Sequence, residues 1–375
     1  MIDIQKRLTK AILIDVVSRE IPRETAEKNL NELARLVQTY GGVVIVQIIQ
    51  KRGRPSLKTY LGTGKAIEAA ETAKEKDVDI VIVNGMLKPH QIQHLYKLFD
   101  IPVWDRVDII LKIFDKHAKT EEARLQIELA RLHHEFPKLY GQGVKLSRLG
   151  GGIGTRGPGE QLLESKKRHL RSRIKEIEKK LDTIKTVRAG QRYIRKRKNL
   201  KTAALVGYTN SGKSTLLRAL TKKKNVYIAN ELFATLDTKI GDLWLPNKRE
   251  KILIADTIGF IKDLPPFLIK SFLATLEEVQ EADLLLHVID ANDPEIQHKI
   301  SVVDKILADL GCSTKKQIYI FNKADLIEDA DTLNKLPRLK NSIKISAIQK
   351  AGLNRLKELI EKLLDSNAVL QPRNT

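Results

Sequence analysis

Residues 203–214 read Ala-Ala-Leu-Val-Gly-Tyr-Thr-Asn-Ser-Gly-Lys-Ser, and this stretch decides the fold of the second half of the chain. Its first four residues are an apolar run of strand length, and its last eight fit the pattern G-x-x-x-x-G-K-[ST]. A strand that leads through such a loop into a helix presents backbone N–H groups to phosphate oxygens. We therefore predict a phosphate-binding loop in which Lys213 reaches the β- and γ-phosphates and Ser214 ligates Mg²⁺. The predicted contacts to the nucleotide are Gly207, Tyr208, Thr209, Asn210, Ser211, Gly212, Lys213, Ser214 and Thr215.

Strand-length apolar runs recur after this loop, and helical patterns separate most of them. The runs occupy residues 252–255, 284–289, 318–321 and 343–345, and residues 353–364 have the pattern of a closing helix. This alternation predicts a doubly wound α/β domain over residues 201–365, with ligands at the carboxyl ends of the parallel strands. Residues 366–375 are expected to form a C-terminal tail.

An acidic motif follows the apolar run at 252–255. Asp256-Thr257-Ile258-Gly259 places an aspartate where a strand ends beside the phosphate loop, and such an aspartate can hold Mg²⁺, usually through water. Gly259 lets its backbone N–H face the γ-phosphate. We therefore predict that Asp256 and Ser214 bind the metal and that Gly259 contacts the nucleotide.

A second polar motif, Asn322-Lys323-Ala324-Asp325, follows the run at 318–321. The Asp325 carboxylate can accept hydrogen bonds from N1–H and N2–H₂ of guanine, a pair that adenine does not offer. Asn322 and Lys323 belong to the same predicted base site. Ser346-Ala347, after the last strand, is predicted to offer a backbone N–H to guanine O6. Together these motifs predict an enzyme that binds GTP and GDP and hydrolyses GTP.

The predicted catalytic set is Lys213, Thr235 and Gly259. Thr235 lies between the phosphate loop and Asp256, and it would complete the Mg²⁺ shell in the triphosphate state and release after hydrolysis. Phe260 follows Gly259, where Ras-type GTPases place the glutamine that orients water. A phenylalanine cannot orient water, so we expect slow intrinsic hydrolysis that needs help from elsewhere.

Asn210 leaves two interpretations open. The loop of some GTPases carries an asparagine that seats a potassium ion beside the phosphates, and the alternative is a hydrogen bond within the loop itself. Comparing hydrolysis in K⁺ and Na⁺ separates the two.

Residues 1–115 are predicted to form a smaller α/β domain with a parallel sheet. The expected strands are 11–17, 43–49 and 80–83, and the expected helices are 24–37, 65–73 and 87–98. Gly62-Thr63-Gly64-Lys65 resembles a phosphate loop only superficially, because it lacks the flanking length and the Ser or Thr after the lysine. We interpret it as a turn that starts a helix.

Residues 116–200 predict an antiparallel pair of helices. Apolar residues recur at heptad-like spacing from Ala118 to Phe136 and from Leu170 to Ile184. Between residues 160 and 201 lie sixteen Lys and Arg side chains against only five carboxylates, and a merely solvated face would mix both signs. We therefore prefer contact with a polyanion over a solvated face, and RNA over a membrane, because the apolar seam is consumed by the partner helix.

A glycine-rich segment, residues 150–160, separates the two predicted helices. It reads Gly-Gly-Gly-Ile-Gly-Thr-Arg-Gly-Pro-Gly-Glu and cannot be helical at ordinary cost. A flexible linker is one interpretation. We prefer a basic loop that adapts to phosphates, because glycines let backbone N–H groups approach them.

The composition bounds the partners and the compartment. The formal net charge is +21 and the isoelectric point about 9.8, so polyanions are the expected partners. Cys312 is the one cysteine, which excludes an internal disulfide. No apolar run has the ~18 residues of a membrane span, so we expect a cytoplasmic protein without an obligate membrane partner. Peripheral membrane association stays open. We also expect a monomer.

These motifs together resemble the HflX family of the Obg-like translational GTPases, over nearly the whole chain. The resemblance rests on residues 150–160, 207–214, 233–237 and 125–130. It implies an N-terminal α/β domain, a helical hairpin and a G domain. It also implies binding to the large ribosomal subunit and the 70S ribosome, with GTP used to split stalled or idle ribosomes. The polyanion would then be ribosomal RNA, contacted through residues 141–200.

One residue departs from the pattern of that family. Thr238 follows Asp237 where the family commonly has proline, which bears on the switch that contains Thr235. Two other functions remain open: a GTPase for ribosome assembly or RNA folding, and a GTPase at an anionic membrane surface.

Overall fold

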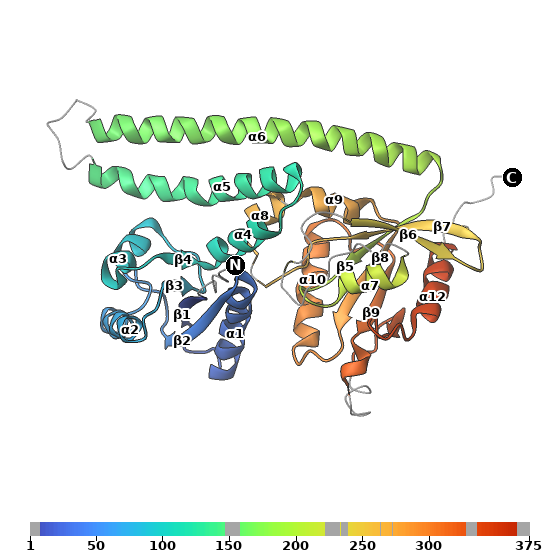
Figure 1. Cartoon of the computed structure of the whole chain (residues 1–375), viewed down its shortest axis with the longest axis horizontal. Helices are drawn as coiled ribbons and strands as arrows, with labels where there is room; N and C mark the ends of the chain where they lie inside the picture. The colour runs from blue at the N-terminus through green and yellow to red at the C-terminus, as the bar shows by residue number, and fades with distance from the viewer. Residues whose placement is uncertain are drawn as a thin grey trace, which may run out of the picture. The chain divides into compact units, whose positions relative to one another are not determined.

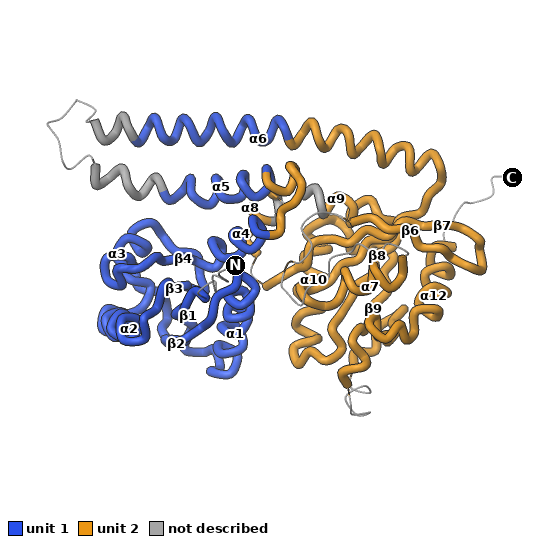
Figure 2. The backbone as a smooth tube through the Cα atoms, viewed as in Figure 1, with its two compact units in different colours: residues 1–116, 125–180 blue, residues 117–124, 181–375 orange. Residues whose placement is uncertain are grey.

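The computed structural model describes residues 8–146, 158–221, 233, 239–262, 264–271, 273–327 and 336–365. Three sequence predictions lie outside these residues: residues 150–157 of the basic glycine-rich loop, the switch that contains Thr235, and the C-terminal tail at 366–375. The last three residues of the glycine-rich segment, 158–160, are not loop as predicted, because they begin a helix. Figure 2 shows the chain divided into two compact units, residues 1–116 with 125–180 and residues 117–124 with 181–375. The three-part division at residues 115 and 200 stays a prediction.

The first unit is built on a four-stranded parallel sheet in the order β2-β1-β3-β4 (Figure 1). Its strands are β1 (Thr9–Val17), β2 (Gly42–Lys51), β3 (Ile80–Val83) and β4 (Val103–Asp105). Its helices are α1 (Arg23–Tyr40), α2 (Thr63–Glu75), α3 (Pro89–Phe99) and α4 (Arg106–His117). Central strands β1 and β3 are almost wholly buried, which explains their continuous apolar sequences.

Residues 62–65 form the start of α2. Gly62 is extended and precedes the first helical residue, Thr63, and the Gly62 N–H donates to Gln50 Oε1 at 2.7 Å. The segment is therefore a turn that starts a helix, as predicted, and its glycine N–H is already used within the sheet edge.

In the first unit, residues 125–146 of helix α5 (Glu121–Leu146) and residues 158–180 of helix α6 (Pro158–Arg197) run antiparallel (Figure 1). Arg173 of α6 donates to both carboxylate oxygens of Glu128 of α5, at 2.7 and 2.9 Å. Ile177 is fully buried in the predicted seam. The prediction that the seam begins at Ala118 is wrong, because Thr120 Oγ1 accepts the Ala123 N–H at 3.2 Å and α5 begins only at Glu121.

The second unit contains a six-stranded sheet in the order β10-β9-β8-β5-β7-β6. Its strands are β5 (Thr202–Val206), β6 (Lys239–Leu245), β7 (Glu250–Asp256), β8 (Leu284–Asp290), β9 (Gln317–Asn322) and β10 (Ser342–Lys344). All neighbours pair in parallel except β6 and β7. This arrangement confirms the predicted doubly wound fold.

Helices flank this sheet, and the loop after β5 opens at its centre (Figure 1). The helices are α7 (Lys213–Leu220), α8 (Pro266–Ser271), α9 (Leu273–Glu281), α10 (Ile296–Asp309) and α12 (Leu353–Asp365), with a short 3₁₀ turn at Ala324–Leu326. In the described part of the chain, no helix combines the length and the apolar composition that a bilayer crossing requires.

Candidate nucleotide-binding site

The loop between β5 and α7 carries a buried lysine. Lys213 Nζ donates to the carbonyl oxygens of Gly207, at 3.1 Å, and Tyr208, at 2.8 Å, so its ammonium is held inside the loop. Burial lowers the pKa of Lys213 to about 8, although the charge of Asp256 opposes this shift. A cation that burial destabilises gains strongly from a phosphate brought beside it.

Two glycines allow the loop to be packed this closely. Gly212 has φ +94°, and a Cβ on it would lie 2.2 Å from Asn322 Nδ2. A Cβ on Gly259 would lie 2.9 Å from the Cα of Thr209 and 3.0 Å from Lys213 Nζ. Larger residues at these positions would push the phosphate loop away from its neighbours.

Two of the three predicted metal ligands, Ser214 and Asp256, meet at the end of the loop. Ser214 Oγ donates to Asp256 Oδ2 at 2.7 Å, and the Asp256 side chain is fully buried at the end of β7. A hydroxyl and a carboxylate are the hard oxygen ligands that Mg²⁺ prefers, so these residues fit the ion. Mg²⁺ held there would neutralise charge on the phosphates.

The base site is joined to the phosphate loop through one buried side chain. Asn322 Nδ2 donates to the Ser211 carbonyl at 2.9 Å, and Asn322 Oδ1 accepts the Ala347 N–H at 3.0 Å. The Ala324 N–H also donates to the Ile345 carbonyl at 3.1 Å. The structure thus joins the phosphate loop to the Asn322 motif, 111 residues away from Ser211, and to the Ser346-Ala347 motif, 25 residues beyond Asn322.

Asp325 has a carboxylate oxygen that is available to accept a hydrogen bond from the guanine base. Its Oδ1 is buried and has no hydrogen-bond partner in the described parts of the chain. A buried carboxylate oxygen is costly to leave unpaired, and the N–H groups of guanine are suitable partners. Lys323 lies in the left-handed conformation beside it, and its Nζ donates to Asp290 Oδ2 at 2.6 Å.

Phe260 contributes to the site only through its backbone. Its side chain is 2% exposed, so it belongs to the core. Its carbonyl accepts the Thr209 N–H at 2.8 Å, and its N–H donates to the Gly207 carbonyl at 3.1 Å. These bonds fix the segment after Gly259 to the phosphate loop. That Phe260 orients no water stays a prediction.

Three contacts of the site were not predicted from sequence. The Tyr208 hydroxyl accepts the Lys262 N–H at 2.8 Å, Asp290 holds Lys323, and Asn322 bridges two loops. A polar residue at the end of an apolar strand was the signal available for Asp290. Asn210 is exposed and takes the left-handed conformation, with φ 61°.

Many cations of α6 are paired with carboxylates from distant sequence. Within the second unit, Arg192 pairs with Glu277 at 3.0 Å, Arg195 with Glu278 at 3.1 Å, and Lys196 with Glu281 at 2.6 Å. All three glutamates lie on α9. At least three cations near the end of α6 are therefore used in ion pairs inside the chain.

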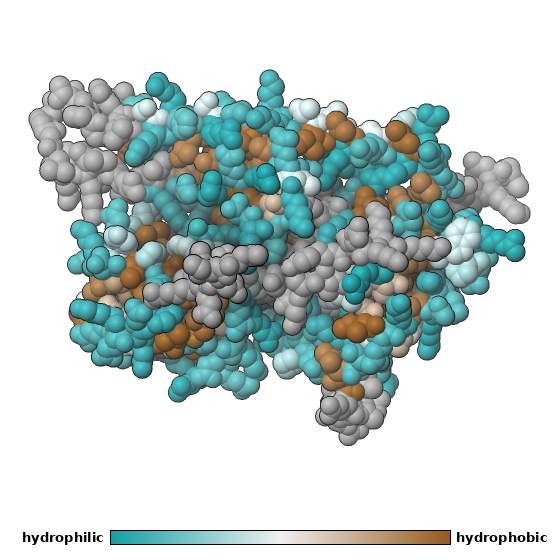
Figure 3. All heavy atoms as spheres, in the orientation of Figure 1, coloured by the Kyte–Doolittle hydropathy of each residue, from teal (hydrophilic) through white to brown (hydrophobic). Residues whose placement is uncertain are grey.

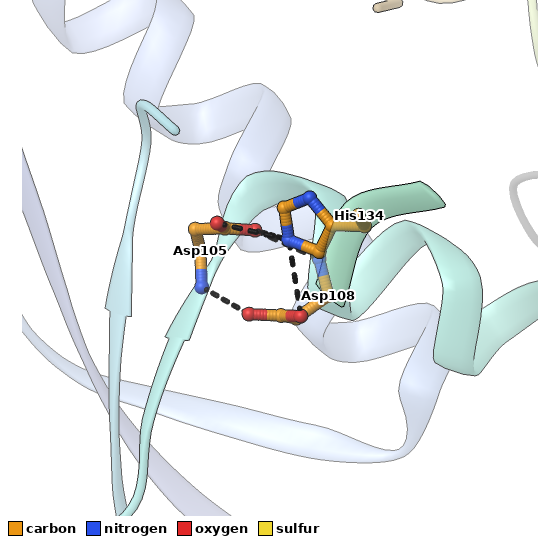
Figure 4. A group of neighbouring side chains, drawn as sticks. All are labelled: Asp105, Asp108 and His134. Atoms are coloured by element: carbon orange, nitrogen blue, oxygen red, sulfur yellow. Dashed lines mark hydrogen bonds and ion pairs between the residues drawn. The ribbon is translucent and has the colours of Figure 1, made fainter. Parts of the chain in front are cut away.

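A second polar cluster lies in the first unit and joins α5 to the sheet (Figure 4). His134 Nε2 lies 3.1 Å from Asp105 and 3.3 Å from Asp108, and Lys138 Nζ lies 3.5 and 3.6 Å from the same carboxylates. Burial opposes the charged imidazole, but hydrogen bonds to the two aspartates outweigh it and raise the pKa of His134 to about 9. Two cations thus balance two carboxylates, and we interpret the cluster as a structural contact.

Comparison with known families divides the chain into three matched regions. Residues 27–115 match the family described as "GTP-binding GTPase N-terminal", and residues 117–195 match "GTP-binding GTPase Middle Region". Residues 202–323 match the family described as "50S ribosome-binding GTPase".

Curated relatives match over most of their length. The GTPase HflX of Caldanaerobacter subterraneus subsp. tengcongensis is 46% identical over 355 residues, which cover 95% of this chain and 80% of the relative. The GTPase HflX of Escherichia coli is 38% identical and covers 90% and 79%. The GTPase HflX of Methanocaldococcus jannaschii is 38% identical and covers 89% and 82%.

A solved structure supports the same fold. The crystal structure of SsGBP in complex with GDP is 26% identical, covers 96% of this chain and 100% of its own, and has a TM-score of 0.52.

Proposed function

The chain belongs to the HflX family of GTPases, and from this premise we propose that it binds the large ribosomal subunit and dissociates stalled or idle 70S ribosomes in its GTP state. It binds GTP and GDP and hydrolyses GTP. Hydrolysis to GDP then releases the protein. Because ribosomes are the proposed partner, we propose that the protein acts in the cytoplasm. We also propose that it acts as a monomer.

The observation that carries the ribosome proposal is the position of the basic helix. α6 ends at Arg197, and β5, which leads into the phosphate loop, begins only five residues later at Thr202. The helix that would bind a polyanion therefore lies close in sequence to the nucleotide site. Ribosomal RNA, contacted through residues 141–200, fits the sign and the extent of the charge.

The proposed residue roles are those that the sequence motifs predict. We propose that Lys213, Gly259 and the N–H groups of residues 207–215 hold the phosphates, and that Asn322, Lys323, Asp325, Ser346 and Ala347 form the guanine site. Ser214 and Asp256 would hold Mg²⁺, with Thr235 joining them in the GTP state. Asn210 would either seat a potassium ion beside the phosphates or form a hydrogen bond within the loop. Because Phe260 lies in the core, a group of the bound ribosome would supply the missing orientation of water.

Sucrose-gradient sedimentation tests the proposal. Purified 70S ribosomes are incubated with the protein and a non-hydrolysable GTP analogue, and wild type is compared with Lys213→Ala. We expect the 70S peak to fall and free subunits to rise with wild type only. Binding to immature particles with an unchanged 70S peak would contradict splitting and favour the assembly role.

A further inference from the structure

The last turns of α6 carry two different faces, and one of them is already used. Arg188, Arg192 and Arg195 recur at spacings of four and three, so they share one side of the helix. Each forms an ion pair with a glutamate of the same unit, at N–O distances from 2.7 to 3.1 Å: Arg188–Glu122, Arg192–Glu277 and Arg195–Glu278. These cations are held inside the chain and contribute little to an external partner.

The opposite side, which we call the outer face, is exposed and partly apolar. Val187, Gly190 and Ile194 share it at spacings of three and four, and Tyr193 follows three residues after Gly190. The exposed fractions are 59% for Val187, 64% for Tyr193 and 55% for Ile194. Figure 3 shows hydrophobic spheres among hydrophilic ones along this helix. Apolar side chains that cluster on a surface mark a contact site.

Gly190 packs against no side chain in the described part of the chain. A Cβ added to it would meet no atom within 4 Å. Glycine destabilises a helix interior relative to alanine, and no neighbour in the described residues requires it here. The missing side chain instead leaves a shallow notch between Val187 and Ile194, where a partner can approach the helix backbone.

The charge around the outer face selects the partner. From Lys185 to Lys198 the sequence has seven Lys and Arg residues and no acid. Arg197 extends the outer face, and Lys198 follows Ile194 by four residues. Among the residues that the structure describes, neither of them forms an ion pair. An aromatic ring beside unpaired cations suits an unstacked base and its phosphates, because a base stacks on tyrosine while Arg and Lys bind the backbone.

We propose that the outer face of α6 binds an unstacked nucleotide of RNA, with the Tyr193 ring on the base, Gly190 admitting the strand, and Arg197 and Lys198 on the phosphates. This rests on the proposed function in that the RNA would be ribosomal. The stacking itself needs no ribosome, so the two can be tested apart.

The first arm uses the full chain and a short fluorescein-labelled single-stranded RNA, with a duplex of the same length for comparison. Fluorescence anisotropy should show Tyr193→Ala binding the single strand about 5- to 100-fold more weakly than wild type. Tyr193→Phe keeps the ring and should bind nearly as wild type does. The matched control is Tyr96→Ala, which removes a tyrosine that is 52% exposed on α3, and it should have no effect.

The second arm separates stacking from charge and from helix stability. Arg197→Ala should reduce the slope of log affinity against log salt by about 0.7, whereas Tyr193→Ala should leave the slope unchanged. Gly190→Leu should raise the thermal midpoint, because leucine favours a helix, and yet weaken RNA binding. A purely structural glycine would move both quantities in the same direction.

The outcomes distinguish this inference from the proposed function. Equal RNA binding by Tyr193→Ala and Tyr96→Ala overturns the inference, even if both variants still dissociate ribosomes. If Tyr193→Ala weakens binding to a poly-glutamate peptide as much as it weakens binding to RNA, the inference is also overturned, because the partner would then be an acidic protein. Loss of single-strand binding in Tyr193→Ala supports it, even if the wild type fails to split 70S particles.

Discussion

Replacing Asn322 by alanine tests how the two halves of the nucleotide site are joined. The substitution removes the hydrogen bond from Nδ2 to the Ser211 carbonyl (2.9 Å) and the one from the Ala347 N–H to Oδ1 (3.0 Å). Asn322 is 2% exposed, so water cannot replace either bond without rearrangement. Each buried backbone group left unpaired costs about 1–3 kcal/mol, and we expect a loss of about 2–5 kcal/mol in the free energy of unfolding.

The same variant should also bind nucleotide more weakly. In the proposed site GDP contacts both the phosphate loop and the base loop, so binding to the variant must order two segments that Asn322 held together. We expect the affinity for GDP to fall about tenfold or more.

Guanidinium unfolding and calorimetric titration with GDP measure the two effects. The matched control is Asn354→Ala, an exposed asparagine on α12, which should stay within about 0.5 kcal/mol of wild type. An Asn322→Ala protein that unfolds like this control and binds GDP like wild type would refute the idea that this side chain joins the site.

Three further predictions follow from the same contacts. Asp325→Asn should exchange guanine for xanthine preference, because the new N–H₂ donor meets the C2 carbonyl of xanthine; competition between GDP and XDP measures this, and unchanged preference would place the base elsewhere. GTP affinity should fall as pH rises through about 8, because the nucleotide-free Lys213 loses its proton there. Over the same range the free energy of unfolding of the nucleotide-free protein should rise, because the buried charge disappears. If neither the affinity nor the free energy of unfolding changed with pH, the burial of this ammonium would be contradicted. Glu278→Ala should destabilise the second unit by about 1–3 kcal/mol, because Arg195 loses a partner in a largely buried pair; the double variant with Arg195→Ala should cost less than the two single losses together, whereas strict additivity would show that the pair is not coupled.

The strands that sequence predicted are those with continuous apolar runs. β5, β8 and β9 lie in the middle of a parallel sheet and are buried on both faces. Strands buried on both faces need apolar residues at nearly every position, which gives the continuous apolar runs. β4 has only three residues, and β6 is an antiparallel edge strand that alternates buried and exposed residues around Gly241 and Asp242. Neither leaves a run long enough to recognise.

The site divides in the same way. Residues such as Lys213 and Asp256 were predictable because their chemistry depends on local spacing after a strand. The bridge made by Asn322 depends on β9 lying two strands from β5, which spacing along the chain does not specify. The pairing of Arg192 and Arg195 with α9 joins residues more than eighty positions apart, so the charge run alone could not show which cations were free.

The most direct test of ribosome dissociation is light scattering from purified 70S particles after rapid mixing with the protein. Scattering should fall with GTP, stay constant with GDP, and stay constant when Lys213→Ala replaces wild type. Constant scattering with GTP, from a preparation that calorimetry shows to bind the nucleotide, would contradict the proposed function while leaving the GTPase site intact.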